Sequence, residues 1–262
     1  MSTPRFYIPP AHWNLDRLAL EADEAHHCLE VLRLAAGARA VVFDGQGHEA
    51  TVEIATARKG RVELRHLQHA QTPPLTCAIT LGQAVPKGKN MEWIVEKATE
   101  LGAAGIVPLL SERTVVRIDA AEAAKKREKW QRVAVEAAKQ CGQNWLPEVA
   151  EPVPLKTFFD TAPKFDLMLI ASLQPDSRHL KTVLAEVAAD APARPGFRAQ
   201  ALRRVLVLVG PEGDFTPAEI ALAKSAGCRP VTLGPIILRT ETAALYCLSV
   251  LSHELFAPGK VR

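Results

Sequence analysis

The sequence predicts an α/β protein of two domains, a small β-rich domain followed by a larger domain built on a mostly parallel sheet. Residues 1–72 contain short apolar strands separated by glycine turns, whereas the remainder alternates buried strands with helices. The stretch Gln71-Thr72-Pro73-Pro74 between the two patterns is typical of a short, stiff linker. We therefore expect domains at 1–72 and 73–262.

Composition narrows the class of protein. The net charge is only +3, so a surface for nucleic acid would have to come from local clusters of Lys and Arg. The five cysteines are scattered and lack Cys-x-x-Cys spacing, so neither a disulfide framework nor a zinc site is predicted. The N-terminus lacks an apolar signal segment, and no apolar run approaches membrane-spanning length. These features predict a cytoplasmic protein with no membrane partner.

The first domain is expected to be a compact barrel. Strands are predicted at 38–43, 49–57 and 61–69, with glycine turns between them. Ahead of these strands, residues 23–34 have the period of a helix and carry His26 and His27. Adjacent helical residues point to different faces and no third ligand has suitable spacing, so capping or an RNA-facing role is favoured over metal binding.

The second domain is expected to open with a βαβ unit. It has a strand at 75–84, a helix at 91–101 and a strand at 105–110. Basic side chains lie at the ends of its strands, where they can meet a phosphate backbone or stay solvated; they are Lys87, Lys89 and Arg113. The later elements expected are a long helix at 120–141, strands at 166–171, 205–209 and 230–232, and a helix ending near residue 256. Residues 190–200 are expected to form a flexible surface insert without a function of its own.

One buried strand ends at Gly210-Pro211, in a loop suited to ligand binding. Gly210 and Gly213 can adopt positive φ and let another molecule approach the backbone closely. The glycine-rich phosphate motifs are absent and Glu212 would repel phosphate, so a cationic or neutral ligand suits the loop better.

The alternative is an ordinary strand-to-helix turn in which Thr216 and Glu219 form a capping box. A second turn at Leu233-Gly234-Pro235 makes ligand binding more attractive, because a short apolar loop and then Arg239 and Glu241 follow it. Two such loops at the carboxyl ends of buried strands form the usual crevice of an open α/β sheet. The turn at Ser172-Leu173 is a candidate third loop.

The two main loops also resemble a known family. Val-Gly-Pro-Glu-Gly-x-Phe at 209–215, paired with Leu-Gly-x-x-Ile-Leu-Arg-x-Glu-Thr-Ala at 233–243, is similar to the signature of the RsmE family, the 16S ribosomal RNA uracil-N3 methyltransferases of the SPOUT superfamily. Arg5-Phe6-Tyr7, His26-His27 and Val31-Leu32-Arg33 are similar to its PUA-like N-terminal domain. The resemblance implies a PUA-like β-barrel that binds RNA and a SPOUT-type domain with a trefoil knot. It also implies S-adenosyl-L-methionine as cofactor, 16S rRNA of the small ribosomal subunit as substrate, and a homodimer.

The resemblance further implies roles for individual residues. Cofactor binding is expected from Ser172, Leu173, Val209, Gly210, Pro211, Glu212, Gly213, Leu233, Gly234, Ile237, Leu238 and Thr242. Arg239 is expected to hydrogen-bond a uracil carbonyl, and Glu241 to accept the N3 proton or to orient Arg239. RNA contacts are expected from Arg5, Arg33, Lys87, Lys89 and Arg113, and dimer contacts from Tyr246, Leu248 and Leu251 of the last helix.

Three positions depart from the family pattern. Asp214 replaces the second glycine of Gly-Pro-Glu-Gly-Gly-Phe, Ile236 replaces an Arg, and Gln143 stands where the family commonly has Arg. These departures make altered affinity plausible without abolishing the site. The rival hypotheses are a non-catalytic RNA-binding assembly factor that keeps the fold, and a methyltransferase that acts on another RNA.

Overall fold

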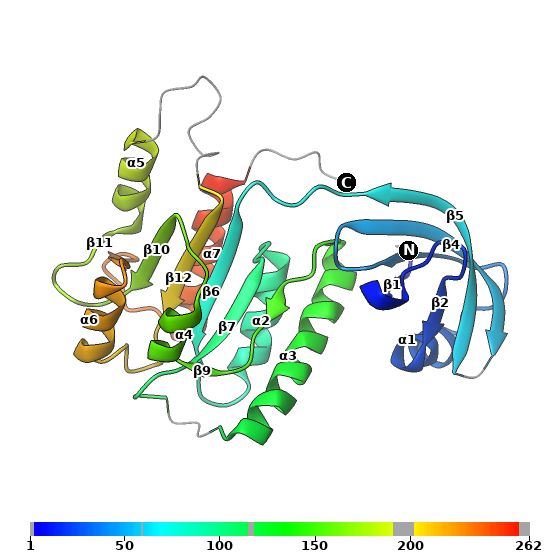
Figure 1. Ribbon diagram of the computed structural model, residues 1–262, viewed down its shortest axis with the longest axis horizontal. Helices are drawn as coiled ribbons and strands as arrows, with labels where there is room; N and C mark the ends of the chain where they lie inside the picture. The colour runs from blue at the N-terminus through cyan, green and yellow to red at the C-terminus, as the bar shows by residue number, and fades with distance from the viewer. Residues whose placement is uncertain (1–2, 59, 115–117, 191–201, 257–262) are drawn as a thin grey trace. The chain divides into compact units, whose positions relative to one another are not determined.

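The computed structural model describes residues 3–58, 60–114, 118–190 and 202–256, so almost all of the insert expected at 190–200 lies outside the described residues. The chain forms two compact units (Figure 1). The first consists of residues 1–74 together with 135–146, and the second of 75–134 together with 147–262. No pattern in the sequence indicates that residues 135–146 belong with the N-terminal segment.

The first unit is a curled β half-barrel. Its five-stranded sheet has the order β1-β3-β4-β5-β2. The strands are β1 Arg5–Tyr7, β2 Ala19–Glu21, β3 Arg39–Phe43, β4 His48–Arg58 and β5 Arg61–Gln71. The long hairpin β4–β5 bends (Figure 1), and two register shifts along it are of the kind that increase strand twist. Alternate residues of these strands, such as Val42, Val52 and Val62, point inward and form the core.

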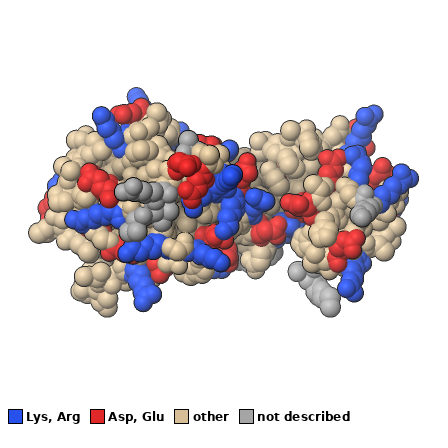
Figure 2. Space-filling model, turned by 90° about the horizontal axis from the view of Figure 1, so that it is seen from below, with Lys and Arg blue, Asp and Glu red and all other residues tan. Residues whose placement is uncertain are grey.

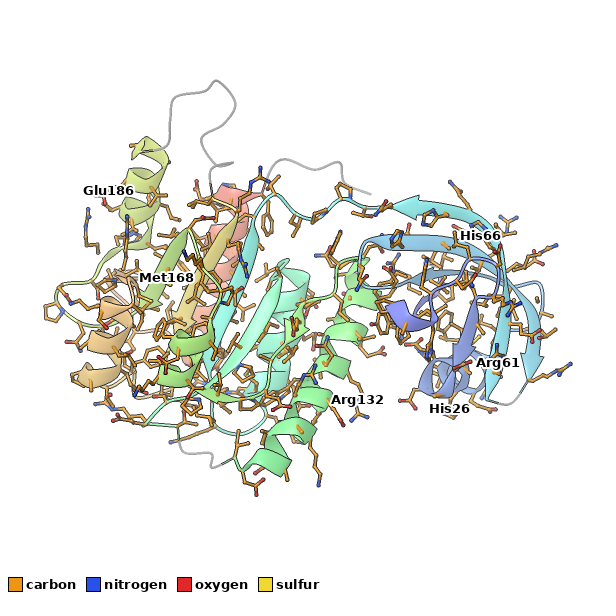
Figure 3. All side chains as sticks on the ribbon, in the orientation of Figure 1. His26, Arg61, His66, Arg132, Met168 and Glu186 are labelled. Carbon is orange, nitrogen blue, oxygen red and sulfur yellow. The ribbon has the colours of Figure 1, made fainter. Side chains whose placement is uncertain are left out.

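The expected helix at 23–34 is interrupted. The structure has the α-helix α1 Ala22–His26, then the π-helix η2 His27–Val31, and Arg33 has a φ of 53°. A short 3-10 helix, η1 Pro10–His12, precedes them. His26 is exposed at the end of α1 (Figure 3), whereas His27 turns inward against Phe6. The two histidines therefore do point to different sides of the backbone.

Residues 135–146 complete the first unit through polar contacts. Lys139 is buried, and its Nζ donates to Glu24 at 3.0 Å and to Glu136 at 2.9 Å, and lies 3.2 Å from Nδ1 of His27. Asn144 accepts a hydrogen bond from Arg5 at 2.6 Å. A buried ammonium is stable only when it is paired, so this network is a structural part of the unit.

The second unit is built on a parallel sheet, which confirms the predicted α/β class. The strand order is β11-β13-β10-β12-β6-β7-β8, with β9 paired to β7, and all pairs between the described strands of this sheet are parallel. The strands are β6 Ala78–Ala84, β7 Gly105–Leu110, β8 Glu148–Val149, β9 Val153–Pro154, β10 Leu167–Ala171, β11 Arg178–His179, β12 Arg204–Val209 and β13 Arg229–Thr232. The helices are α2 Asn90–Glu100, α3 Ala120–Cys141, α4 Leu155–Thr161, α5 Leu180–Asp190, α6 Pro217–Ser225 and α7 Thr240–Leu255.

Helices cover both faces of the central strands. Leu206 and Leu208 of β12 belong to a buried cluster with Phe158 of α4 and Ile220 of α6. Side chains alternate along a strand, so Val207 points to the opposite face, where α7 packs on α2, β6 and β12. Burial on both faces explains why the central strands are continuous apolar runs. Among the described helices, none has the length and apolar character needed to cross a membrane.

The chain returns across the sheet after β13. That strand lies between β10 and β11, yet the next helix, α7, packs on β6 and β12. The trefoil knot implied by the resemblance would involve this crossing and stays a prediction. The expected dimer contacts need a correction, because Leu248 and Leu251 are only 1% and 0% exposed within the chain. They belong to the core of the unit and cannot reach a partner, whereas Tyr246 is 37% exposed.

Candidate cofactor and active site

A cavity of about 450 Å³ lies at the carboxyl ends of β10, β12 and β13, bordered by the start of α7. Of the residues expected in the site, it is lined by Ser172, Leu173, Val209, Gly210, Pro211, Glu212, Leu233, Gly234, Ile237, Leu238, Arg239 and Glu241. Gly213 and Thr242 do not line it. The lining further contains Asn90, Ala171, Asp214, Val231, Thr232, Ile236, Thr240 and Ala243. The structure thus brings together three loops that lie far apart in the sequence.

The loop after β12 is tight for a reason other than the expected one. Neither Gly210 nor Gly213 has positive φ; the left-handed residue of this loop is Asp214, with φ 58°. Gly210 is closely packed instead, because a Cβ there would lie 3.1 Å from both the Asp214 carboxylate and the Phe215 backbone nitrogen. In the other loop, Gly234 has a φ of 128°, which favours glycine strongly.

A buried hydrogen-bond chain holds the start of α7 against the sheet. The Thr240 hydroxyl donates to the carbonyl of Gly210 at 2.6 Å and accepts from Nε2 of Gln83 at 3.0 Å. Gln83 is fully buried in β6. The sequence reasoning missed both residues, although a glutamine within an apolar buried strand was an available signal, since buried polar groups need partners.

Backbone amides join the loop after β10 to the loop after β12 and to strand β13. Leu173 N donates to the Asp214 carboxylate at 3.2 Å, and Ser172 N donates to the carbonyl of Val231 at 3.0 Å. The Glu212 carboxylate accepts a hydrogen bond from Lys87 N at 2.9 Å. These contacts connect the carboxyl ends of four strands around the cavity.

The capping box predicted after β12 is confirmed, and it coexists with the cavity. Thr216 Oγ1 accepts from Glu219 N at 3.3 Å, and the Glu219 carboxylate accepts from Thr216 N at 2.8 Å. The same carboxylate, which is buried, accepts from Ser111 Oγ and Glu112 N, both at 3.0 Å. Glu219 therefore starts α6 and also anchors the loop after β7.

The charges of the cavity wall favour a cationic ligand. Glu212, Asp214 and Glu241 contribute carboxylates, and Arg239 contributes the single lining guanidinium among the described residues. Arg239 is exposed at the N-cap of α7, and within the described chain no ion pair joins it to Glu241. The helix-start salt bridge is therefore not formed, and the guanidinium is available to a ligand.

The cavity fits the cofactor implied by the resemblance. S-adenosylmethionine carries a sulfonium cation, which the three carboxylates of the wall match. Its adenine needs apolar surface, which Ile237 and Leu238 provide at the cavity edge. The volume lies in the range of small-molecule sites.

The basic residues expected at RNA lie in both units. Lys87, Lys89 and Arg113 are exposed in the second unit, and Arg113 donates to the carbonyl of Gly213 beside the cavity. In the first unit Arg33 is exposed, whereas the Arg5 side chain is 16% exposed and bonded to Glu49 and Asn144. Lys and Arg are interspersed with Asp and Glu over the face shown in Figure 2.

Known proteins place the chain in a family. A family model described as RNA methyltransferase domain matches residues 73–252, and one described as RNA methyltransferase PUA domain matches residues 20–65. The chain is 30% identical to ribosomal RNA small subunit methyltransferase E of Bacillus subtilis, over 90% of each chain. It is 33% identical to the protein of that name from Synechocystis, over 96% of this chain and 78% of the relative.

Solved structures agree with these matches. The Neisseria gonorrhoeae ribosomal RNA small subunit methyltransferase E bound to S-adenosyl methionine superposes with a TM-score of 0.80 at 30% identity, covering 96% of this chain and 98% of the other. A Legionella pneumophila protein in complex with the cofactor SAM superposes with a TM-score of 0.83 at 35% identity, covering 97% and 98%. The chain belongs to the ribosomal RNA small subunit methyltransferase E family, with a PUA domain and an RNA methyltransferase domain.

Proposed function

We propose that this enzyme methylates N3 of a uridine in 16S ribosomal RNA, with S-adenosyl-L-methionine as methyl donor. One observation carries the proposal: the loops after β10, β12 and β13 meet in a cavity with acidic and apolar walls, and at its edge stands an exposed arginine that has no ion pair with any described residue. Membership of the small subunit methyltransferase E family supports the choice of RNA.

The cofactor would be held mainly by backbone groups. Val209-Gly210 and Leu233-Gly234 would meet its adenine and ribose, and Ile237 and Leu238 would pack on the adenine. Ser172, Leu173, Pro211 and Glu212 would complete the wall. Gly213 and Thr242 do not line the cavity, so their assignment rests on the family resemblance alone. When bound, the cofactor supplies an electrophilic methyl carbon.

The side chains at the start of α7 would handle the charge of the uracil. N3 must lose its proton to become nucleophilic, and negative charge then spreads onto the neighbouring carbonyl oxygens. The Arg239 guanidinium would donate hydrogen bonds to one of these oxygens and stabilise that charge. Glu241 lies in the cavity wall and is not tied to Arg239, so its carboxylate would accept the N3 proton.

The base must leave its stack to enter the cavity, because N3 lies on the Watson–Crick edge. Lys87, Lys89 and Arg113 would hold phosphates near the cavity. In the first unit Arg33 is exposed and can reach a phosphate directly. Arg5 would first have to give up its hydrogen bonds to Glu49 and Asn144. We assign RNA binding to a PUA-like domain at 1–72 and catalysis to a SPOUT domain with a trefoil knot at 73–262.

The enzyme would act as a homodimer in the cytoplasm. Tyr246, Ser249 and His253 follow one exposed face of α7 at helical spacing, and such a face is suited to a second copy of the chain. No disulfide joins the cysteines, all of which lie among the described residues, as is usual in a reducing compartment.

The test is methyl transfer from labelled S-adenosylmethionine to small ribosomal subunits and, separately, to naked 16S rRNA, both from a strain in which the gene is deleted. We expect label in the RNA and N3-methyluridine by nucleoside mass spectrometry, with intact subunits preferred. Calorimetry with S-adenosylmethionine serves as the companion measurement. Heat of binding without any methyl transfer would support the assembly factor instead, and a different labelled nucleoside would support the other RNA substrate.

A further inference from the structure

We infer that Asp214 is a positioning residue that organises the cofactor cavity before ligand binding, by fastening the loop after β10 to the loop after β12. The inference rests on the proposed cofactor and deepens it. Asp214 stands where the family pattern has glycine, and it lines the cavity together with Leu173 and Gly210.

The backbone of Asp214 is in a conformation that suits glycine better. Its φ is 58°, in the left-handed region that aspartate tolerates at some cost and glycine adopts freely. The turn is closed by a hydrogen bond from Asp214 N to the carbonyl of Pro211 at 2.9 Å, which glycine would make equally well. Strained residues persist where the surroundings hold them, and at binding sites the strain often serves preorganisation.

The side chain supplies what glycine lacks. One carboxylate oxygen accepts from Leu173 N at 3.2 Å, and the other accepts from Phe215 N at 2.7 Å. Phe215 is buried at 1% exposure, so the second bond fixes the carboxylate to a rigid part of the unit. The first bond then reaches across to a different strand's loop.

Apart from this bond, the outer part of the loop is held by two local hydrogen bonds, from Gln174 N to Ser172 Oγ and from Ser177 N to the Gln174 carbonyl, and by an exposed ion pair of Asp176 with Lys224. None of these contacts reaches the loop after β12. The Leu173 side chain is 61% exposed, so it contributes little packing. Without the carboxylate, ligand binding would have to order the Leu173 segment, and that ordering would reduce the observed affinity. Asp214 thus prepares one wall of the cavity in advance.

The test compares Asp214→Gly and Asp214→Ala with the wild type, using calorimetry with S-adenosylmethionine and with S-adenosylhomocysteine. Both variants lose the acceptor oxygens, but only alanine retains the backbone strain. We expect the Kd for both ligands to rise about fivefold in either variant, because ligand binding must then order the loop that the hydrogen bond from Leu173 N holds in the wild type. The KM for S-adenosylmethionine should rise in parallel while kcat changes little. Thermal stability should be kept in the glycine variant and reduced in the alanine variant.

Two further readouts separate fastening from charge. S-adenosylhomocysteine has no sulfonium, so a loss of affinity confined to S-adenosylmethionine would assign the effect to the carboxylate charge and overturn the inference. Amide hydrogen exchange of the ligand-free protein should become faster at residues 172–174 in the glycine variant, and unchanged exchange there would also overturn it. Asp160→Asn, which removes an exposed carboxylate on α4, is the matched control and should behave as wild type.

These measurements distinguish failure of the role inferred for Asp214 from failure of the proposed methyltransferase function. If the wild type binds S-adenosylmethionine but methylates no ribosomal RNA, the proposed function fails and the binding comparison still decides the role of Asp214. If the wild type does not bind S-adenosylmethionine, the proposed function fails, and the exchange measurement decides whether Asp214 fastens the loop. An Asp214→Gly protein that binds both ligands as tightly as wild type refutes the role of Asp214 alone.

Discussion

Two adjacent residues at the start of α7 have opposite tasks. The Thr240 side chain is buried and bonded to Gly210 and Gln83, whereas Arg239 is exposed at the edge of the cavity. Because Thr240 holds the first turn of the helix in place, the backbone that carries Arg239 is fixed although its side chain is free. Such an arrangement presents an exposed charged group from a rigid base.

Arg239→Ala should therefore lower turnover far more than cofactor binding. Loss of one donor to a developing negative charge typically costs about 10²-fold in kcat. We expect kcat for methyl transfer to small ribosomal subunits to fall by that factor. The Kd for S-adenosylmethionine, measured by calorimetry, should stay close to that of the wild type. Arg239→Lys keeps the charge without the planar fork and should recover only part of the rate. Normal methylation by the alanine variant would remove Arg239 from the mechanism.

The sequence identified those site residues whose roles are set by their immediate neighbours in the chain. The two loop motifs pointed to the residues that line the cavity because each motif lies in one short stretch. Gln83 and Asp214 take their roles from partners 157 and 41 residues away, and no local pattern reveals such partners. Gly210 does not use the positive φ that a glycine allows, and its close approach is to Asp214 and Phe215 of its own loop.

At the scale of elements, Glu219 joins a helix start to a neighbouring loop. Its carboxylate serves both the capping box of α6 and the loop after β7, through Ser111 and Glu112. Glu219 therefore stabilises both the start of α6 and the loop after β7, whereas an ordinary capping residue stabilises the helix alone. The loop after β7 also carries Arg113, so the anchor supports a residue proposed to meet RNA.

Glu219→Ala should lower the free energy of unfolding by about 2–3 kcal/mol, because three donors lose a charged acceptor in a buried place. Urea denaturation followed by circular dichroism measures the change. Lys224→Ala on the same helix removes an exposed ion pair with Asp176 and should cost little. Equal stability of the two variants would contradict the structural role of Glu219.

Strands and helices differed in how well the pattern predicted them. Apolar runs identified β6, β7, β10 and β12, since strands buried on both faces have continuous hydrophobic sequence. The two-residue strands β8, β9 and β11 were missed because so short a run has no period. The helix expected at 23–34 breaks into α1 and the π-helix η2 at His27, whose ring lies edge-on against Phe6; the periodicity of the sequence does not distinguish a π-helix from an α-helix.

At the scale of the whole molecule, the Lys139 network makes stability depend on pH. Burial, together with the nearby Lys139 ammonium, lowers the pKa of His27 below its ordinary value. Burial raises the pKa of Glu24, although Lys139 opposes that shift. Glu136, His26 and the ring of Phe6 are the other groups close to His27.

The lowered pKa sets the direction of the effect. Below the ordinary pKa of about 6.5 the unfolded state takes up a proton that folded His27 resists, so stability from this group is lost as pH falls. Glu24 has the opposite effect on stability. Because its pKa is raised in the folded state, the stability that it contributes is present at low pH and is lost as pH rises through that folded-state pKa. We expect His27→Gln to lose less stability than wild type between about pH 7.5 and pH 5.5 in urea denaturation. His26→Gln, altered at the exposed neighbour, should keep the wild-type dependence, and an identical slope in all three proteins would exclude His27.

The proposed dimer can be tested at the exposed face of α7. Tyr246→Asp places a charge on that face and should convert the dimer to a monomer in sedimentation velocity, with the fold retained by circular dichroism. Glu254→Lys, exposed on the same helix but off that face, should stay dimeric. A wild-type protein that sediments as a monomer would contradict the dimer itself.

The sequence predicted two domains and their classes, but the composition of the first unit required the structure. Residues 135–146 join it through Lys139, Asn144 and Trp145, each of which contacts a residue from the N-terminal segment. Contacts over so large a separation follow from tertiary packing alone. A single boundary near residue 72 describes the sequence pattern and leaves out this returning segment.

The returning segment has a consequence for how the protein is made. During synthesis the first 74 residues leave the ribosome early, yet the partners of Glu24, Arg5 and Thr72 are added only when residues 139–145 have been translated. The N-terminal half-barrel must therefore wait, incompletely closed, while the opening βαβ unit of the following sheet emerges. Its maturation is delayed until residue 145 has been made, so a chaperone has its longest opportunity to act on the first part of the chain.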